Sequence, residues 1–308
     1  MSYEHIFDEL DIDADPFALC ELQGRSRLGL GRQPFAMLHY VLAGDGEIIV
    51  GDHPPIHVER GTLVLVPAIQ PHTLSSLGGQ GNPLPDCHPA ELDLARHLRL
   101  DIDAETDGGL LAICSQVKVG VRGLSGLIDL IRDPLIERIG PESAMVGAVD
   151  QLLHELSRPK LGSRAMIRAL LLQCMIQLLR SRLTSNEPGL RWMAALADEN
   201  LWSALRLMLD QPGHAHSVES LAEAAGMSRS TFAQRFSEAY GSGPMELLRS
   251  LRMHLAASLL SESDLPVKRI AELAGFKSRS AFSRAFEGIV GKSPQSFRSD
   301  ARNTNQGS

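Results

Sequence analysis

Residues 218 to 302 contain one sequence pattern twice, and this duplication constrains the fold more than any other feature of the 308-residue chain. Each copy has a short apolar stretch, a glycine, a serine-containing turn and two phenylalanines four residues apart. Gly226 and Gly275 are 49 residues apart, whereas Phe232 and Phe282 are 50 apart, so the second turn is one residue longer. The pattern predicts two helix-turn-helix units, over 218–239 and 266–289.

The two turns have the chemistry that ends one helix and starts another. Glycine adopts a left-handed backbone conformation at little cost, so we expect Gly226 and Gly275 to end the first helix of each copy. Ser228 and Ser278 follow, and a serine hydroxyl can accept a hydrogen bond from an amide at the start of the next helix. The paired phenylalanines predict an apolar stripe on the inner face of that helix.

The outer face of each second helix carries side chains suited to DNA. Arginine can bond guanine through two hydrogen bonds, glutamine can bond adenine in the same way, and serine can contact either base. A solvated helix face is the alternative, but repetition of both turn and face favours a DNA-binding surface. The residues expected to contact DNA are Arg229, Ser230, Ala233 and Gln234 in the first copy, and Arg279, Ser280, Ser283 and Arg284 in the second.

A long helix is expected to join the two copies, because Pro244 suits a first helical position and leucines recur at helical spacing as far as Leu259. Two recognition helices in successive major grooves would lie about 34 Å apart. The segment 200–298 resembles the DNA-binding domain of the AraC/XylS family of transcription regulators. The resemblance is carried by Ala271, Gly275, Phe276, Phe282, Phe286, Gly291 and Pro294. It implies double-stranded promoter DNA and RNA polymerase as partners.

The charge distribution agrees with a DNA-binding part beside another module. Residues 191–308 carry 14 Lys and Arg against 12 Asp and Glu, whereas the other residues carry 16 against 25. The net charge of −7 argues against a general polyanion binder. The N-terminus lacks a signal-peptide pattern, and the most apolar stretch, 165–179, is interrupted by polar residues. We therefore expect a cytoplasmic protein with no membrane role.

The amino-terminal part has the pattern of a small β-barrel. From Phe35 to Leu74, short runs of Val, Ile and Leu alternate with turn signals. We expect strands over 36–42 and 47–50, joined by a hairpin turn at 44–46, and a further strand over 61–67. The order of Gly61, Pro67 and His72 resembles the second motif of the cupin jelly roll, over about residues 16–119.

These patterns predict an α+β multidomain chain with an N-terminal cupin-like β-barrel and a C-terminal all-α tandem helix-turn-helix domain. The expected divisions are a cupin-like sensor domain over 1–120 with an insertion at 78–109, a helical linker over 121–189, a DNA-binding domain over 190–300 and a disordered tail over 301–308. Apolar residues take helical spacing from Leu124 to Leu178. An exposed apolar stripe there would suit a homodimer, and the alternative is that these helices cover the barrel.

The barrel lacks the motif of a catalytic cupin. Enzymatic cupins present a His-x-His pair and a downstream Glu that hold a metal, whereas here His39 is followed by Tyr40 and Val41. We therefore expect a sensor and not an enzyme. A metal-dependent cupin enzyme with an appended DNA-binding module is the alternative from another class. The cupin resemblance implies that His39 and His72 point into the barrel.

Two cysteines extend the resemblance. Cys20, His39, His72 and Cys114 match, in order and approximate spacing, the redox-responsive AraC-type regulators with a cupin sensor, which include the regulator of resistance to reactive chlorine. The resemblance implies a switch in which oxidation or ligation at Cys20 and Cys114 alters DNA binding. The same four residues are a donor set that zinc or copper prefers, and a histidine can lower the pKa of a neighbouring thiol. Cys87 is a further candidate thiol, and the alternative for Cys114 is inert packing.

The sequence thus predicts a transcription activator that responds to oxidant through Cys and His groups of the cupin domain. A regulator whose small-molecule ligand fills the barrel, with incidental cysteines, is the other alternative. Four cysteines without a CxxC pair, in a reducing compartment, argue against a structural disulfide framework.

Overall fold

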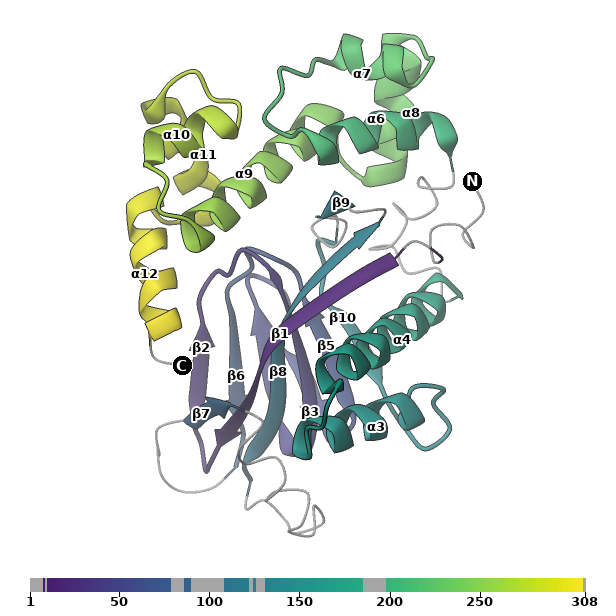
Figure 1. The fold of residues 1–308 in the computed structure, drawn as a ribbon, viewed down its shortest axis with the longest axis vertical. Coiled ribbons are helices and arrows are strands. Elements are labelled where there is room, and N and C mark those ends of the chain that lie inside the picture. The colour runs from purple at the N-terminus through teal and green to yellow at the C-terminus, as the bar shows by residue number, and fades with distance from the viewer. Residues whose placement is uncertain are drawn as a thin grey trace. The chain divides into compact units, whose positions relative to one another are not determined.

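The computed structural model of the chain describes residues 8, 10–78, 86–89, 108–121, 124–125, 131–184 and 198–306 (Figure 1). It divides into two compact units. The barrel unit comprises residues 12–118 and 133–181, and the helical unit comprises residues 1–11, 119–132 and 182–308. Within the described residues, none of the helices combines the length and apolarity that crossing a membrane would need.

The described strands form one 10-stranded antiparallel sheet that curls on itself, as the cupin resemblance predicts (Figure 1). Its order is β10-β5-β3-β8-β1-β7, and β2, β4, β6 and β9 pair off this path. The strands are β1 (Leu10–Leu22), β2 (Arg27–Leu30), β3 (Ala36–Val50), β4 (Ile56–Glu59), β5 (Thr62–Val66), β6 (His72–Ser76), β7 (Asp86–Pro89), β8 (Leu110–Val121), β9 (Leu124–Ser125) and β10 (Leu135–Arg138).

Strand β3 is longer than the sequence predicts, and the hairpin turn expected at 44–46 is wrong. Residues 36–44 pair with β5 and β8, and residues 45–50 pair with β4 and β6. Gly44 has a φ of 78°, and a β-carbon on Gly46 would overlap the carbonyl oxygen of Ser75. The two glycines therefore bend one strand from one half of the barrel to the other, a use of glycine that resembles a turn signal in sequence.

Buried aliphatic side chains form the core cluster of the barrel unit. Val41, Ile48, Val64 and other completely buried residues form one cluster, and Cys20 and Cys114 belong to it. Because close-packed side chains fix one another's positions, a change in bonding at either cysteine alters the packing of its neighbours in this cluster.

The helical linker expected from Leu124 begins with strands instead. β9 starts at Leu124, and β10 pairs with β5 at one end of the sheet. Among the described residues of this segment, helices follow from Val146, as α3 (Val146–Ser157) and α4 (Ser163–Thr184). Both helices bury leucines, including Leu152 and Leu178, so each has an apolar side packed against protein.

The helical unit contains both predicted helix-turn-helix copies (Figure 1). Gly226 and Gly275 have φ of 61° and 78°, and Ser228 and Ser278 cap the helices that follow, each accepting a backbone N–H bond of 3.2 Å. These features confirm the turn prediction. The helices are α6 (Glu199–Asp210), α7 (Val218–Ala224), α8 (Arg229–Tyr240), α9 (Pro244–Glu262), α10 (Val267–Leu273), α11 (Arg279–Val290) and α12 (Pro294–Gln306).

Aromatic packing holds each copy together. Phe232 and Phe236 in α8, and Phe282 and Phe286 in α11, are completely buried, as their spacing predicts. The ring of Phe286 also meets that of Phe297 edge-on at 5.5 Å, which packs α12 against the second copy. Helix α12 extends to Gln306, into the segment expected to be a disordered tail.

Candidate functional site

The first residues of α8 and α11 lie at the surface, where a groove of DNA could receive them. Arg229, Ser230 and Gln234 are exposed in α8, and Arg279, Ser280 and Arg284 are exposed in α11. Ala233 and Ser283, at equivalent helix positions, are half-buried. The structure therefore places all eight residues proposed from the sequence on the two recognition helices.

The arginine that opens the first recognition helix is held by a carboxylate. Arg229 Nη1 lies 2.9 Å from an oxygen of Glu219, which belongs to α7 of the same copy. Hydrogen bonds from its own backbone and from Ser217, followed by the charge of Arg229, lower the pKa of Glu219. Gln234 also donates to an acid, Glu238, at 2.9 Å. DNA must compete with these acids for the polar side chains of the first copy.

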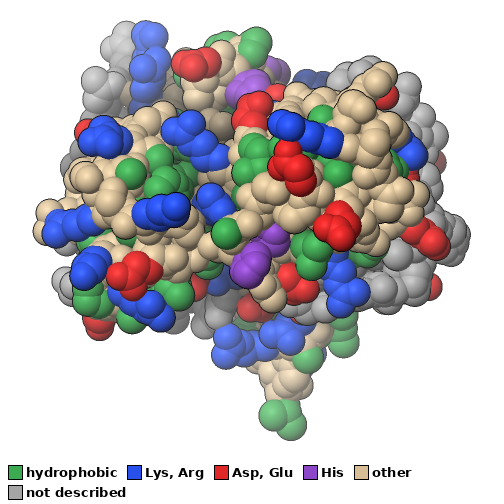
Figure 2. Space-filling model, turned by 90° about the horizontal axis from the view of Figure 1, so that it is seen from above, with side chains coloured by type: hydrophobic (Ala, Val, Ile, Leu, Met, Phe, Trp, Pro, Cys, Tyr) green, Lys and Arg blue, Asp and Glu red, His purple; other side chains and the backbone are tan. Residues whose placement is uncertain are grey.

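The second copy is more basic than the first. Residues 267–290 contain five Lys and Arg and two Asp and Glu, whereas residues 218–240 contain two and three. Figure 2 shows basic side chains gathered on the left, over the second copy, and mixed acidic and basic side chains on the right, over the first. Within the part of the chain that the structure describes, Arg279 and Arg284 have no ion-pair partner. Lys277, the extra residue of the second turn, is exposed as well, and it was not among the eight residues predicted to contact DNA.

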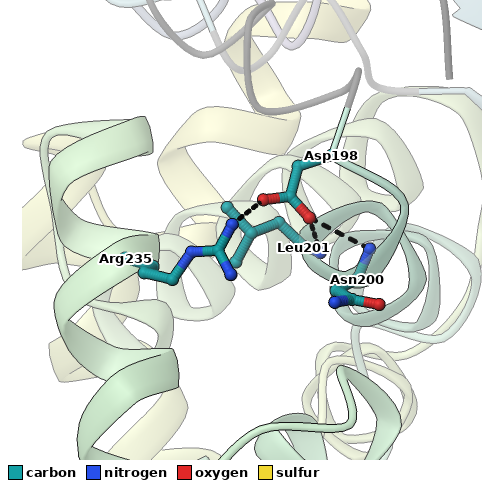
Figure 3. A network of polar contacts seen from close by, with 4 residues as sticks. All are labelled: Asp198, Asn200, Leu201 and Arg235. Carbon is teal, nitrogen blue, oxygen red and sulfur yellow. Dashed lines mark hydrogen bonds and ion pairs between the residues drawn. The ribbon is translucent and has the colours of Figure 1, made fainter.

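A polar network ties the first recognition helix, α8, to the start of α6 (Figure 3). Asp198 caps α6 by accepting backbone N–H bonds from Asn200 and Leu201 at 3.1 and 3.3 Å. The second carboxylate oxygen of Asp198 accepts a hydrogen bond from Arg235 of α8. Arg235 is thus engaged within the protein, and its charge steadies α8.

In the barrel unit, three candidate sensor residues form a buried chain. His39 of β3 lies opposite Cys114 of β8 in the strand register, and its Nδ1 is 3.0 Å from the Cys114 sulfur. The other ring nitrogen of His39, Nε2, is 2.8 Å from Nε2 of His72. Nδ1 of His72 is 3.4 Å from the carbonyl oxygen of Gln70. All three side chains are at most 3% exposed.

Hydrogen-bond geometry assigns the protons in this chain. A carbonyl oxygen only accepts, so His72 Nδ1 carries a proton and its Nε2 accepts one from His39. His39 Nδ1 then accepts from the Cys114 thiol. Each group is neutral and each donor has one acceptor.

Burial favours the same neutral state. It lowers the pKa of His72 to about 4, and burial with the nearby His72 lowers the pKa of His39 well below its usual value. Burial raises the pKa of Cys114 to about 12. Cys114 is therefore a thiol at neutral pH, because His39 accepts from the thiol without carrying a positive charge that would favour the thiolate.

The four residues considered for zinc or copper do not assemble one donor set. The two nitrogens of His39 point to opposite sides of its ring, and Cys114 occupies one side while His72 occupies the other. Cys20 lies in a disulfide, so it has no thiolate to offer. Among the described residues, no group of three or more His, Cys, Asp or Glu side chains is arranged to hold a metal ion. These four residues therefore do not fit the zinc or copper site considered from the sequence.

Cys20 forms a disulfide, which corrects the expectation that the chain has no structural disulfide. Its partner in the backbone register of β1 and β7 is Cys87, and Cys114 and Cys174 are free. Cys87, the further candidate thiol, belongs to β7. The lack of a CxxC pair and the expected reducing compartment pointed the other way, since the spacing of cysteines along the chain does not reveal which strands become neighbours.

Comparisons with known proteins agree with both units. A family model described as a helix-turn-helix domain matches residues 221–300, and one described as a cupin matches residues 4–184, more than half of the chain. The chain belongs to the AraC family of transcriptional regulators and carries a cupin domain. This family assignment establishes a DNA-binding transcriptional regulator.

Similar regulators match this AraC-family chain over nearly its whole length or over about a third of it. The HTH-type transcriptional regulator AlkR of Acinetobacter baylyi is 27% identical over 300 residues, which are 95% of this chain and 97% of AlkR. RclR of Escherichia coli, named an RCS-specific HTH-type transcriptional activator, is 41% identical over 110 residues, 36% of this chain and 39% of RclR. The structure of ToxT from Vibrio cholerae matches with a TM-score of 0.52 and 12% identity, over 94% of this chain and 98% of that one. The ToxT match shows a common two-domain fold.

Proposed function

We propose that this regulator activates transcription in response to an oxidant, and that a disulfide between Cys20 and Cys87 is the switch. The observation that carries the proposal is the disulfide at Cys20, since Cys87 lies opposite it and the other two cysteines are free. The name of the similar Escherichia coli protein, an RCS-specific transcriptional activator, supports both an oxidant signal and activation.

Hypochlorous acid is the oxidant that we propose, because it converts two thiols into a disulfide in two steps. A thiolate attacks the chlorine atom, releasing hydroxide and forming a sulfenyl chloride. The second thiol then attacks that sulfur and displaces chloride. In total, two thiols and one hypochlorous acid give one disulfide, one chloride ion, one proton and one water, and the cysteines lose two electrons.

The disulfide controls how one end of the sheet is held. β7 is a four-residue strand at the end of the sheet order, and β1 is its neighbour. Among the described contacts, a pairing of four residues with β1 holds β7 when the covalent bond is absent, and Cys20 can repack within the cluster that also contains Cys114. The chain of β1 and of β8 continues from the barrel unit into the helical unit, so a changed sheet has a covalent route to the DNA-binding helices.

Cys114 and the two histidines have a different proposed role. Their neutral hydrogen-bonded chain joins β3, β6 and β8 across the barrel interior. Because each buried polar atom in the chain has a partner, the chain stabilises one arrangement of these strands. We propose that this hydrogen-bonded chain holds the sheet in place while the disulfide at its end forms or breaks.

The structural features support the oxidant switch over its two alternatives. Buried aliphatic side chains pack together in the barrel unit, and a small-molecule effector that bound among them would have to part them. The cupin enzyme alternative needs a set of metal ligands, and His39, His72 and Cys114 lie in a row that one ion cannot bridge. DNA recognition itself is assigned to the eight residues at the starts of α8 and α11.

Transcription in vitro tests the proposed switch together with its partners. The template carries a duplex selected by the protein from a random pool, placed upstream of a core promoter, and RNA polymerase is added to reduced or briefly chlorinated protein. We expect oxidant to raise transcript yield with the wild type and with Cys174→Ser, a matched control at another buried cysteine. Cys20→Ser and Cys87→Ser should abolish the response, and Cys114→Ser should keep it.

Two results would contradict the switch while leaving the family assignment intact. One is an oxidant response that persists in Cys20→Ser, and the other is a response lost only in Cys114→Ser. A transcript yield that falls on oxidation would show a repressor. Sedimentation of the same samples tests the homodimer proposed from the linker helices.

A further inference from the structure

Three segments of the helical unit meet beside the turn of the second copy. One is the loop 211–216, which leads from α6 into the first copy, and another is α9, which joins the copies. Arg252 of α9 donates from Nε to the Pro212 carbonyl oxygen and from Nη2 to the His214 carbonyl oxygen, each at 2.8 Å. One guanidinium therefore ties the joining helix to the loop of the first copy.

Two glycines bring that loop against the turn between α10 and α11. A β-carbon on Gly213 would overlap the carbonyl oxygen of Leu273. A β-carbon on Gly275 would lie 2.5 Å from the Gly213 carbonyl oxygen and 3.1 Å from Cζ of Arg252. Loop, turn and guanidinium are in direct contact, with no room for another side chain between them.

The bonds of Arg252 are of a kind that resists rearrangement. The side chain is half-buried, and burial lowers its pKa, although an arginine remains charged at neutral pH. Hydrogen bonds from a charged donor are roughly twice as strong as neutral ones. Both acceptors are backbone carbonyl oxygens, so the bonds fix the path of the main chain itself.

We propose that Arg252 is a positioning residue that sets the separation and rotation between the two recognition helices, and so the half-site spacing that the protein accepts. A single joining helix would let each copy pivot about it, and the junction of Arg252, Gly213 and Gly275 supplies a second connection that prevents this. The inference rests on the proposed function, because it requires both copies to bind the same DNA.

DNA geometry turns such rigidity into selectivity. B-DNA repeats every 10 to 10.5 base pairs, so one inserted base pair rotates the second half-site by about 35° and shifts it by about 3.4 Å. A rigid pair of helices cannot follow that change at both half-sites, whereas a pair that pivots can.

Binding to duplexes of altered spacing tests the proposal. The probe is a fluorescent duplex selected by the wild-type protein from a random pool, together with versions carrying one inserted or one deleted base pair between the footprinted half-sites. The full chain is compared as wild type, Arg252→Ala, and Arg249→Ala, which removes an exposed arginine from the same helix. Gly213→Ala opens the junction without a charge change, and Gly288→Ala adds the same methyl group where no atom lies within 4 Å.

We expect wild type and both control variants to lose at least about tenfold in affinity when the spacing changes. Arg252→Ala and Gly213→Ala should lose less than about threefold, while still binding the original duplex. Identical spacing profiles for all five proteins would overturn the inference, as would a wild type indifferent to spacing. If Arg252→Ala does not fold, as circular dichroism would show, Gly213→Ala decides alone. A wild type that selects no duplex would refute the proposed function instead.

Discussion

Acid should destabilise the barrel unit through its two buried histidines. Burial lowers the pKa of His72 to about 4, whereas a histidine in an unfolded chain titrates near 6.5. Between these two pH values the unfolded state therefore binds a proton at His72 and the folded state does not. The stabilising effect is fully present above pH 6.5 and is lost as the pH falls towards 4. At pH 5 the His72 shift alone removes about 2 kcal/mol from the free energy of unfolding, and His39 adds to this loss.

Urea unfolding at pH 7.5 and pH 5 measures this loss. Far-UV circular dichroism follows the unfolding of the whole chain. Tryptophan fluorescence reports the unfolding of the helical unit, to which Trp202 belongs, and so distinguishes it from that of the barrel unit. His72→Gln keeps a polar side chain that does not titrate, so it should lose most of the pH dependence. His57→Gln, at an exposed position, is the matched control and should behave as wild type. Equal unfolding free energies of wild type at the two pH values, or an unchanged acid loss in His72→Gln, would refute the reasoning.

Two other predictions concern the DNA-binding helices. Asp198→Ala removes the cap of α6 and the partner of Arg235, and should lower the free energy of unfolding by about 1 to 2 kcal/mol. Asp198→Asn keeps the cap and should lower it by less than about 1 kcal/mol. Equal losses for the two variants in thermal unfolding would show that the cap is unimportant. Arg284→Ala should reduce the slope of log affinity against log salt by about 0.9, as expected for one lost phosphate contact. Arg229→Ala should change that slope less, because Glu219 already neutralises Arg229 in the free protein; a larger change than for Arg284→Ala in anisotropy titrations would contradict this.

The tandem helices could be predicted because their signals are local. Ser228 and Gly275 act on backbone within a few residues of themselves, so their roles are visible in the sequence. The duplication then confirmed each signal against its copy. The strands of the barrel were recognisable for the same reason, since alternating runs and turns are also local patterns.

Features that depend on distant partners could not be predicted. Gly44 and Gly46 have the composition of a turn, and only the neighbouring strands decide that the chain bends there and does not reverse. The pairing of Cys20 with the strand of Cys87 depends on how the residues between 78 and 109 return to the sheet. Arg252 bonds two backbone carbonyl oxygens, and such acceptors exist at every residue, so no pattern in the sequence points to them.

The most direct test of the account is a single ratio, the affinity for the selected duplex of oxidised protein divided by that of reduced protein, measured by fluorescence anisotropy at one salt concentration. We predict a ratio far from one for wild type and for Cys114→Ser, and a ratio of one for Cys20→Ser. A ratio of one for wild type would contradict the claim that the disulfide at Cys20 governs DNA binding. The same would follow if Cys20→Ser had the same ratio as wild type.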